Sequence, residues 1–418
     1  MVQANCVNSR LRFGSYAATA VMLCAVSARA ADADRSVFSF NGFGTLGVVH
    51  SSEDHADFTS SLYKPNGAGF SHNWSPDVDS LIGAQVTANV APRLSAVLQV
   101  IAEQNYDKSY RPHVEWANIK YQFTADCSIR VGRTVLPAFL FSETRKVTYT
   151  YPWVRPPIEV YRLLPVTSED GLDVSYRLHL GELTSTVQAN AGRRTTHIVE
   201  GGTTEARDTW GVSDSTEYGP LTLQITYVKT HLTVSSLNSF FDVFRQFGPQ
   251  GIAIADKYNS NAKPLSNIGV GASYDSGNWL VMSEWGHSHT PSFIGNSTAW
   301  YVSGGYRFGK FMPSITYSQA KADNLSDPGL NVSAVPPLVV GPATGLNAAL
   351  NSILSTKPVQ NTISAGARWD VLQNVSLKLQ LDHTRIGAGS SGVLTNIQPG
   401  FQTGGEFTLF SVSIDFVF

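Results

Sequence analysis

Residues 406–418 read EFTLFSVSIDFVF, and this C-terminal stretch alternates between apolar and more polar residues. The apolar positions are Phe410, Val412, Ile414, Phe416 and Phe418, and the intervening positions are Leu409, Ser411, Ser413, Asp415 and Val417. Successive side chains of a β-strand point to opposite faces, so the pattern predicts a strand with one apolar and one more polar face. A strand of about 9–11 residues crosses a membrane, and this stretch is long enough.

The same alternation recurs in fifteen further segments of the chain. They are 37–50, 80–90, 94–105, 114–123, 127–135, 170–180, 183–192, 209–217, 221–232, 266–274, 279–288, 298–308, 311–321, 360–371 and 375–385. Seven connections are short turns, and eight are longer: 51–79, 106–113, 136–169, 193–208, 233–265, 289–297, 322–359 and 386–405. Short and long connections alternate, which is typical of outer-membrane barrels with short periplasmic turns and long external loops. We therefore expect an all-β fold, a 16-stranded antiparallel transmembrane β-barrel with both termini at the periplasmic end.

The composition is consistent with such a barrel and narrows the alternatives. The 418 residues are 42% hydrophobic and 15% charged, with a formal net charge of −2, whereas soluble domains average about 25% charged residues. The chain has no basic excess, which argues against a nucleic-acid partner. No stretch of about 18 apolar residues is expected in the chain, which rules out a helical membrane protein. A secreted β protein and a soluble two-domain protein stay open on composition alone, and the alternation favours the barrel.

The first thirty residues have the features of a secretory signal peptide. Arg10 and Arg12 precede an apolar run at 15–26, and Ala28-Arg29-Ala30 is a small-x-small cleavage site. Removal of residues 1–30 changes the formal charge from −2 to −5, because three arginines leave with the peptide. The remaining chain, 31–418, is expected to form a single barrel domain with one cysteine, Cys127, and no disulfide.

Aromatic residues gather beside the short turns. They are Tyr121, Phe123, Tyr218, Tyr274, Trp279, Phe308, Phe311, Trp369, Phe416 and Phe418. An aromatic girdle at a membrane interface predicts this clustering, whereas the general abundance of aromatics in strands does not explain their concentration at one end.

The opposite parity of the strands is polar and predicts a wet interior. Its members include Gln85, Thr87, Gln99, Glu103, Ser128, Arg130, Asp173, Arg177, Gln188, Lys378, Gln380 and Asp382. About sixteen strands enclose an aqueous channel, and polar groups at these positions would be costly in a dry core. A water-filled pore with such a wall passes small hydrophilic solutes and ions.

At this point the chain resembles a known family. The export signal, sixteen strands, the opening stretch FNGFGTLG (residues 40–47), the stretch IRVGR (129–133) followed by a long loop, and the terminal Phe418 are similar to general porins of Gram-negative bacteria. The resemblance implies an outer-membrane location beside lipid and lipopolysaccharide, a homotrimer, and a loop after the fifth strand that folds inward and constricts the pore. The matching loop here, 136–169, lacks the family's acidic PEFGG-like tip.

The loop 136–169 is rich in proline, aromatic residues and arginine, which argues against disorder. Its charged residues are Glu143, Arg145, Lys146, Arg155, Glu159 and Arg162, and together with Arg130, Asp173 and Arg177 they are the expected constriction residues. A basic excess at the narrowest point favours anions. We therefore expect a mild anion preference, or a transverse field of arginines facing carboxylates; the alternative is that these side chains pair with one another or lie outside.

Other motifs do not predict a catalytic or metal site. Gly42–Gly47 matches G-x-G-x-x-G, but no helix follows it, as a dinucleotide site requires. His287 and His289 share a parity without a third ligand nearby, and Asp382 and His383 are strand neighbours that point to opposite faces. Arg133 falls on the lipid-side parity, which leaves open a bulge, a snorkelling side chain or a subunit contact.

Three functional classes compete. A general diffusion channel needs no catalytic residue, cofactor or metal, and it is the leading interpretation. A substrate-specific channel of the same architecture is the second, favoured by the aromatic and arginine content of 136–169. A barrel enzyme or a surface adhesion protein is the third.

Overall fold

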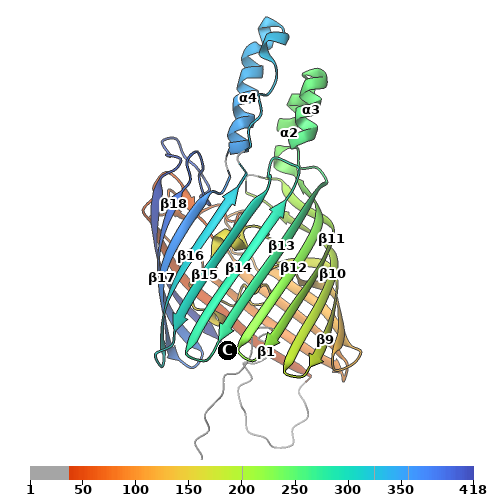
Figure 1. The fold of residues 1–418 in the computed structure, drawn as a ribbon, viewed down its shortest axis with the longest axis vertical. Coiled ribbons are helices and arrows are strands. Elements are labelled where there is room, and N and C mark those ends of the chain that lie inside the picture. The colour runs from red at the N-terminus through yellow and green to blue at the C-terminus, as the bar shows by residue number, and fades with distance from the viewer. Residues whose placement is uncertain (1–36, 200, 324, 356) are drawn as a thin grey trace, which may run out of the picture.

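The computed structural model describes residues 37–199, 201–323, 325–355 and 357–418, so the expected signal peptide lies outside the described residues. The architecture is a closed antiparallel barrel with strands inclined to its long axis (Figure 1). The long strands are β1 (Phe38–Ser51), β5 (Leu81–Ala91), β6 (Leu94–Glu103), β7 (His113–Gln122), β8 (Cys127–Val135), β9 (Ser168–Leu180), β10 (Leu183–His197), β11 (Thr203–Tyr218), β12 (Leu221–Val234), β13 (Lys263–Asp275), β14 (Trp279–His289), β15 (Ser297–Tyr306), β16 (Phe311–Ala322), β17 (Gln360–Leu372), β18 (Val375–Ile386) and β19 (Glu406–Val417). The short strands β2 (Asp57–Phe58), β3 (Ala68–Gly69) and β4 (Trp74–Ser75) lie in the loop after β1.

The barrel closes where the first strand meets the last. β1 pairs antiparallel with β19, and its other edge pairs with β5. Closure leaves no strand edge exposed to lipid, where backbone groups would have no hydrogen-bond partner. A Cβ built on Gly42 would lie 2.1 Å from the ring of Phe418. Gly42, part of the G-x-G-x-x-G match, therefore makes room for the terminal aromatic ring.

The two parities of the terminal strand face opposite sides, as the sequence predicts. Phe410 and Ile414 are exposed on the outer face, whereas Ser411, Ser413 and Asp415 are fully buried inside. The expected girdle residues Tyr218, Trp279 and Trp369 are likewise exposed. The outer surface therefore has the apolar, aromatic-rimmed character of a membrane barrel.

The strand boundaries agree with the alternation to within a few residues except around β10 and β11. We expected a loop at 193–208, but β10 continues to His197 and β11 begins at Thr203. This expectation is wrong because a bulge between Gly192 and Arg194 lets the ladder continue past an interruption of the alternation. Arg194 consequently lies on the wall of the barrel.

The loops after β12 and β16 contain helices that the strand pattern did not predict. The loop after β12 holds α2 (Asn238–Arg245) and α3 (Gly248–Tyr258), and the loop after β16 holds α4 (Val340–Ser355). These helices project beyond the strand ends (Figure 1). Phe244 of α2, Ile254 of α3 and Leu350 of α4 belong to one buried cluster.

The segment Pro337–Ser355 has a mean hydropathy of 1.2 and is, by length and composition, apolar enough to cross a membrane. The expectation that the chain contains no such stretch is therefore wrong for this segment. In the structure this segment stands above the barrel end (Figure 1), and residues of α4 share a buried cluster with residues of α2 and α3.

The facing of Arg133 is resolved by an ion pair. Its Nε and Nη2 donate to the two carboxylate oxygens of Asp170 at 2.6 and 3.0 Å, and its Nη1 donates to the Val114 carbonyl at 3.0 Å. Arg133 and Asp170 are opposed in the ladder, near the outer ends of their strands and on the face of the exposed Val131 and Leu172. The charge of the Arg133 guanidinium is thereby neutralised by Asp170 near the outer end of the barrel wall.

Candidate functional site

The candidate site is the interior of the barrel, which is crossed by the segment between β8 and β9. This segment, residues 136–167, is called the inner loop below. It contains the 3₁₀ turn η1 (Thr148–Thr150) and the one-turn helix α1 (Ile158–Tyr161), visible in yellow inside the barrel in Figure 1. Its contacts with strands from several sides of the wall place it within the lumen.

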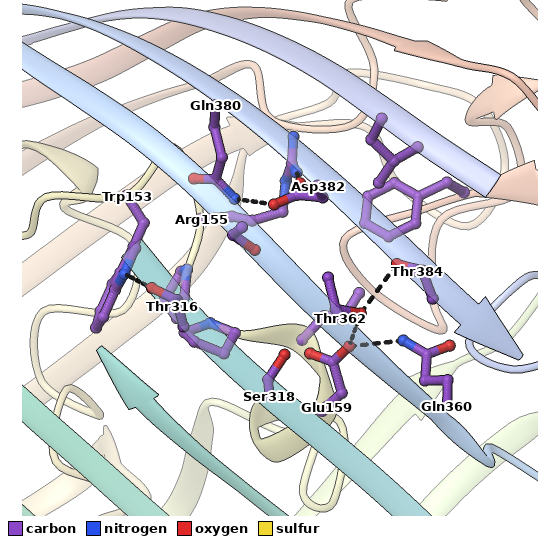
Figure 2. Close-up of a pocket in the computed structure, with 16 residues that line it drawn as sticks. Trp153, Arg155, Glu159, Thr316, Ser318, Gln360, Thr362, Gln380, Asp382 and Thr384 are labelled. Atoms are coloured by element: carbon purple, nitrogen blue, oxygen red, sulfur yellow. Dashed lines mark hydrogen bonds and ion pairs between the residues drawn. The ribbon is translucent and has the colours of Figure 1, made fainter. Parts of the chain in front are cut away.

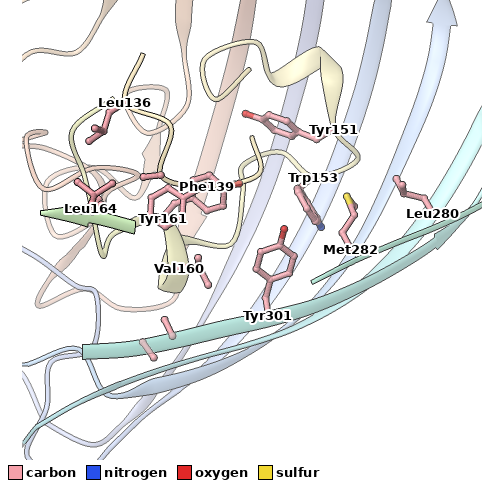
Figure 3. Packing of buried hydrophobic residues seen from close by; sticks show 14 of the residues in the cluster. Leu136, Phe139, Tyr151, Trp153, Val160, Tyr161, Leu164, Leu280, Met282 and Tyr301 are labelled. Carbon is pink, nitrogen blue, oxygen red and sulfur yellow. The ribbon is translucent and has the colours of Figure 1, made fainter. Parts of the chain in front are cut away.

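Apolar packing fixes one part of the inner loop. Phe139, Tyr151, Trp153 and Tyr161 form a buried cluster with Met282 of β14 and Tyr301 of β15 (Figure 3). Full burial of a large apolar side chain contributes roughly 1.5–3 kcal/mol. The Trp153 indole N–H donates to the Ser303 and Thr316 hydroxyls, both at 3.0 Å, so its polar edge is satisfied as well.

Glu284 adds polar contacts beneath this apolar cluster. Its Oε1 accepts hydrogen bonds from the hydroxyls of Tyr161 and Tyr301 at 2.7 and 2.9 Å, and its Oε2 accepts from the Leu140 N–H at 2.8 Å. A buried carboxylate with several donors holds both ends of the segment 140–161 on β14.

A buried ion pair holds the middle of the inner loop. Lys378 Nζ lies 2.8 Å from Asp415 Oδ2, and both side chains are fully buried. The same ammonium donates to the carbonyls of Thr148 and Trp153 at 2.6 and 2.9 Å. Asp415 in turn accepts from the hydroxyls of Thr45 and Thr148 at 2.7 and 2.8 Å. One lysine therefore forms an ion pair with a wall carboxylate and donates hydrogen bonds to two carbonyls of the loop.

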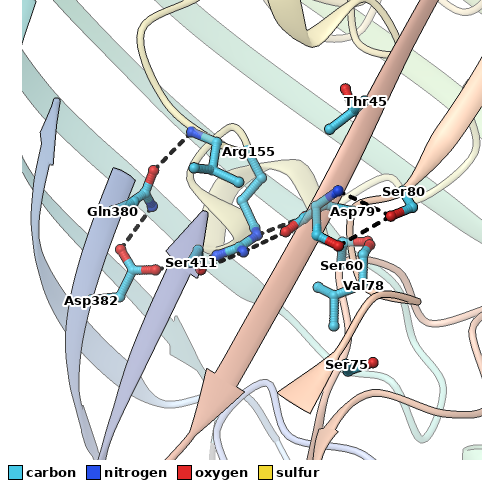
Figure 4. A network of polar contacts seen from close by, with 12 residues as sticks. Thr45, Ser60, Ser75, Val78, Asp79, Ser80, Arg155, Gln380, Asp382 and Ser411 are labelled. Carbon is cyan, nitrogen blue, oxygen red and sulfur yellow. Dashed lines mark hydrogen bonds and ion pairs between the residues drawn. The ribbon is translucent and has the colours of Figure 1, made fainter. Parts of the chain in front are cut away.

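A second ionic anchor centres on Arg155 (Figure 4). Its guanidinium binds Asp79 through Nε at 2.9 Å and Nη2 at 2.6 Å, and reaches Asp382 through Nη1 at 3.2 Å. Nη2 also donates to the Ser411 hydroxyl at 2.7 Å. The adjacent Val154 N–H donates to Gln380 Oε1 at 2.9 Å. Arg155 is 7% exposed and its charge is paired with Asp79 and Asp382, so it is not available to solutes in the pore.

The remaining charged side chains at this end of the inner loop also form hydrogen bonds with protein groups. Glu159 accepts from Gln360 and Thr362 of β17 at 2.7 and 2.6 Å (Figure 2). Arg162 donates to the Val393 carbonyl. Arg145 donates to the carbonyls of Tyr161 and Leu164 at 2.8 and 3.2 Å. Beside Arg155 and Glu159 a cavity of about 30 Å³ is left, which has room for little more than water.

The loops 51–79 and 387–405 also fold against the inner loop. Phe58, Val78 and Leu394 pack with Ile158 in a buried cluster that includes Phe407 and Leu409 of β19. This side of the lumen is thus filled by protein, from β17 through β19 to β1.

The opposite wall, from β7 to β10, carries a ladder of charged side chains. Arg130 of β8 donates from Nε to Asp173 at 2.7 Å and from Nη1 to Glu143 of the inner loop at 3.2 Å. Gln188 of β10 donates to the other oxygen of Asp173. Lys120 of β7 lies directly opposite Arg130 in the backbone pairing of β7 with β8. Arg177 lies on the same parity of β9 as Asp173, toward the short turns, and is exposed.

The structure thus divides the expected constriction residues into two groups. Arg130, Glu143 and Asp173 meet on the β8–β9 wall, Lys146 pairs with Glu103 of β6 above them, and Arg177 lies below. Arg145, Arg155, Glu159 and Arg162 are bound to loop carbonyls or to the far wall. Two residues of the site were not predicted from the sequence. Asp79 lies in a loop, where no alternating pattern marks it. Lys120 could have been found, because the alternation of its strand places it inside.

Comparisons with known proteins agree with this architecture. Residues 165–389, more than half of the chain, match the family model of the Gram-negative porin. No curated protein matches by sequence. Among solved structures, an anion-selective porin from Comamonas acidovorans is 13% identical with a TM-score of 0.56, covering 91% of this chain and 99% of its own.

Two further solved structures share the fold. OmpF of Salmonella typhi, in complex with daunomycin, is 13% identical with a TM-score of 0.52 and coverages of 91% and 97%. The outer-membrane channel DcaP of Acinetobacter baumannii is 10% identical with a TM-score of 0.52 and coverages of 92% and 99%. At these identities the likeness concerns the fold. Together with the family match over 165–389, it shows that the chain belongs to the Gram-negative porin family and is an outer-membrane channel.

Proposed function

We propose that the channel is a water-filled diffusion pore whose narrowest part lies between residues 143–146 of the inner loop and the wall of β6 to β10. The observation that carries this proposal is the way the inner loop is anchored across the lumen. Lys378 and Arg155 tie it to the β17–β19 side, and Glu143 and Lys146 reach toward Arg130 and Glu103 on the other. Solutes would pass along the charged ladder, and no catalytic group takes part.

The balance of paired and unpaired charges on this wall supports a mild anion preference. Around Lys120 and Arg130 the carboxylates of Glu143 and Asp173 each have a cationic partner, as does Glu103, whereas Glu115 and Glu169 near the outer strand ends have no lysine or arginine within 4 Å among the described residues. Among the described residues Lys120 and Arg177 form no ion pair within 4 Å, although Glu217 lies close enough to interact with Arg177. An uncompensated cation in a narrow pore raises the local concentration of anions.

Reversal potentials across planar bilayers in a KCl gradient test this preference. We expect chloride to permeate about three to ten times better than potassium, because fields inside charged clefts amount to a few kT. Equal permeabilities or a preference for potassium would contradict the anion preference while leaving the pore itself intact.

We also propose that the channel is a homotrimer in contact with lipopolysaccharide. The outer face of β19, β1, β5 and β6 is apolar, with Leu46, Ile82 and Leu98 exposed and small alanines between them. Such a face suits a subunit contact. Exposed Lys229 and Lys321, near the outer strand ends, suit lipopolysaccharide phosphates.

The oligomeric state can be measured by light scattering of the detergent-solubilised protein after size-exclusion chromatography. We expect three chains per particle, and replacement of Ile82 and Leu98 by aspartate to give single chains that still form barrels. A wild-type particle of one chain would rule out the trimer.

A further inference from the structure

A cavity of about 250 Å³ lies at the outer mouth of the barrel, above the charged ladder. Its walls come from the loops after β1 and β6, the inner loop, and the outer ends of β7, β8 and β10. Tyr63, Lys64, Gln104, His113, Lys146 and Arg194 are among its lining residues. The volume is slightly below the range of about 300–1,000 Å³ that is usual for ligand sites, so the cavity suits a small molecule.

Arg194 gives the cavity an uncommitted positive charge. In the described part of the chain its guanidinium has no carboxylate within 4 Å, whereas the neighbouring Arg133 is bound to Asp170. Lys64 and Lys146 both pair with Glu103, and the buried Glu115 supplies a second carboxylate to the wall, so Arg194 carries the net positive charge of the cavity. An anionic group is the natural partner for such a set, and a guanidinium binds a carboxylate with two parallel hydrogen bonds.

Two buried polar atoms in the cavity wall have no hydrogen-bond partner. They are Oε1 of Gln104, whose side chain is almost fully buried, and Nδ1 of His113. The amide oxygen of Gln104 can only accept. His113 Nε2 lies 3.8 Å from both Glu103 and Glu115, and in the neutral ring that carries its proton on Nε2 the Nδ1 atom is an acceptor. Unpaired buried acceptors are costly, and hydroxyl groups of a ligand would satisfy them.

Aromatic rings complete the wall. Tyr106 of the loop after β6 stacks on His197 of β10 with their centroids 4.8 Å apart, which joins the two sides of the mouth. Burial raises the pKa of Tyr63 to about 12, so this phenol stays a neutral hydrogen-bonding group at physiological pH.

We propose that this cavity is a capture site for a small hydroxycarboxylate, whose carboxylate binds Arg194 and whose hydroxyls donate to Gln104 and His113. The site would concentrate such solutes above the constriction, and in this sense it rests on the proposed channel function. It turns a general pore into one that saturates with a particular class of solute.

Isothermal titration of the full-length, detergent-solubilised protein with D-gluconate tests the proposal. The matched probes are hexanoate, which has the carboxylate without hydroxyls, and glucose, which has hydroxyls without the charge. We expect saturable binding of gluconate and at least tenfold weaker binding of the other two, because each lacks one half of the interaction. Inorganic phosphate is the fourth probe, and binding as tight as that of gluconate would reduce the cavity to a plain anion site and overturn the proposal.

Two arginines at adjacent positions provide the variant and its control. Arg194→Gln should weaken gluconate at least tenfold, whereas Arg193→Gln, on the opposite and exposed face of β10, should leave it unchanged. Gln104→Leu should bring gluconate and hexanoate closer together in affinity.

Wild-type protein that conducts KCl normally but binds no gluconate overturns the capture site alone, whereas protein without any conductance overturns the channel proposal itself. Heat-dependent migration on gels checks that each variant forms a barrel.

Discussion

Replacement of both Lys378 and Arg155 by methionine is expected to detach the inner loop from the wall and to raise the single-channel conductance. The change leaves Asp415, Asp79 and Asp382 without their cationic partners in a buried setting. Removing one partner of a buried pair costs about 3–5 kcal/mol, so each of the two losses weakens the attachment of the inner loop to this wall. Water would enter to solvate the carboxylates, and the loop would leave its fixed position across the lumen. Planar-bilayer recordings would show larger and noisier conductance steps.

Arg385→Met is the matched control for this experiment. Arg385 lies on the same strand as Lys378, but it faces outward and its side chain is 71% exposed, so its loss should leave the conductance unchanged. A second variant, Lys378→Met with Asp415→Asn, also removes the carboxylate charge that Lys378→Met alone leaves unpaired. Its conductance steps should be closer to those of the wild type than the steps of Lys378→Met are. If the double methionine variant folds and conducts like the wild type, the inner loop does not form the constriction.

Reversal of the two unpaired cations, Lys120→Glu with Arg177→Glu, is expected to invert the selectivity of the pore. Both residues share the inward parity of the β7–β9 wall, and the exchange changes the charge of the lumen by four units. Field strengths of a few kT then favour potassium over chloride by about three- to tenfold. Reversal potentials in a KCl gradient should change sign.

The control carries the same change in net charge elsewhere. Arg93→Glu with Lys310→Glu reverses two exposed cations in the short turns, so it should shift the reversal potential far less. Equal shifts from the two double variants would mean that overall charge, and not the ladder, sets the selectivity. The readout is independent of loop anchoring, because neither Lys120 nor Arg177 contributes to the contacts of Lys378 or Arg155.

The wall of the barrel was predictable because its signal is local. Each of Phe410, Ile414, Ser411 and Asp415 reports its own face through the period of two, and the short turns between such segments set the strand order. A membrane leaves only one way to satisfy the backbone of so many strands, which is closure. Even Arg133, which parity places on the lipid side, needed only Asp170 on the neighbouring strand to explain how its charge is accommodated.

The assignment of individual charges was not predictable, because it depends on contacts far apart in the chain. The composition of 136–169 indicated a basic excess, but it did not indicate that Arg155 would meet Asp79 and Asp382, which lie 76 and 227 residues away. Nor did it reveal that Glu159 would lie against β17, or that β10 would continue past Gly192 and place Arg194 at the outer mouth. Local alternation is enough to specify a barrel, since every strand obeys the same pleat. Which charges stay available to solutes depends on how one inner loop packs across the lumen, and that packing is decided by partners that no short stretch of sequence contains.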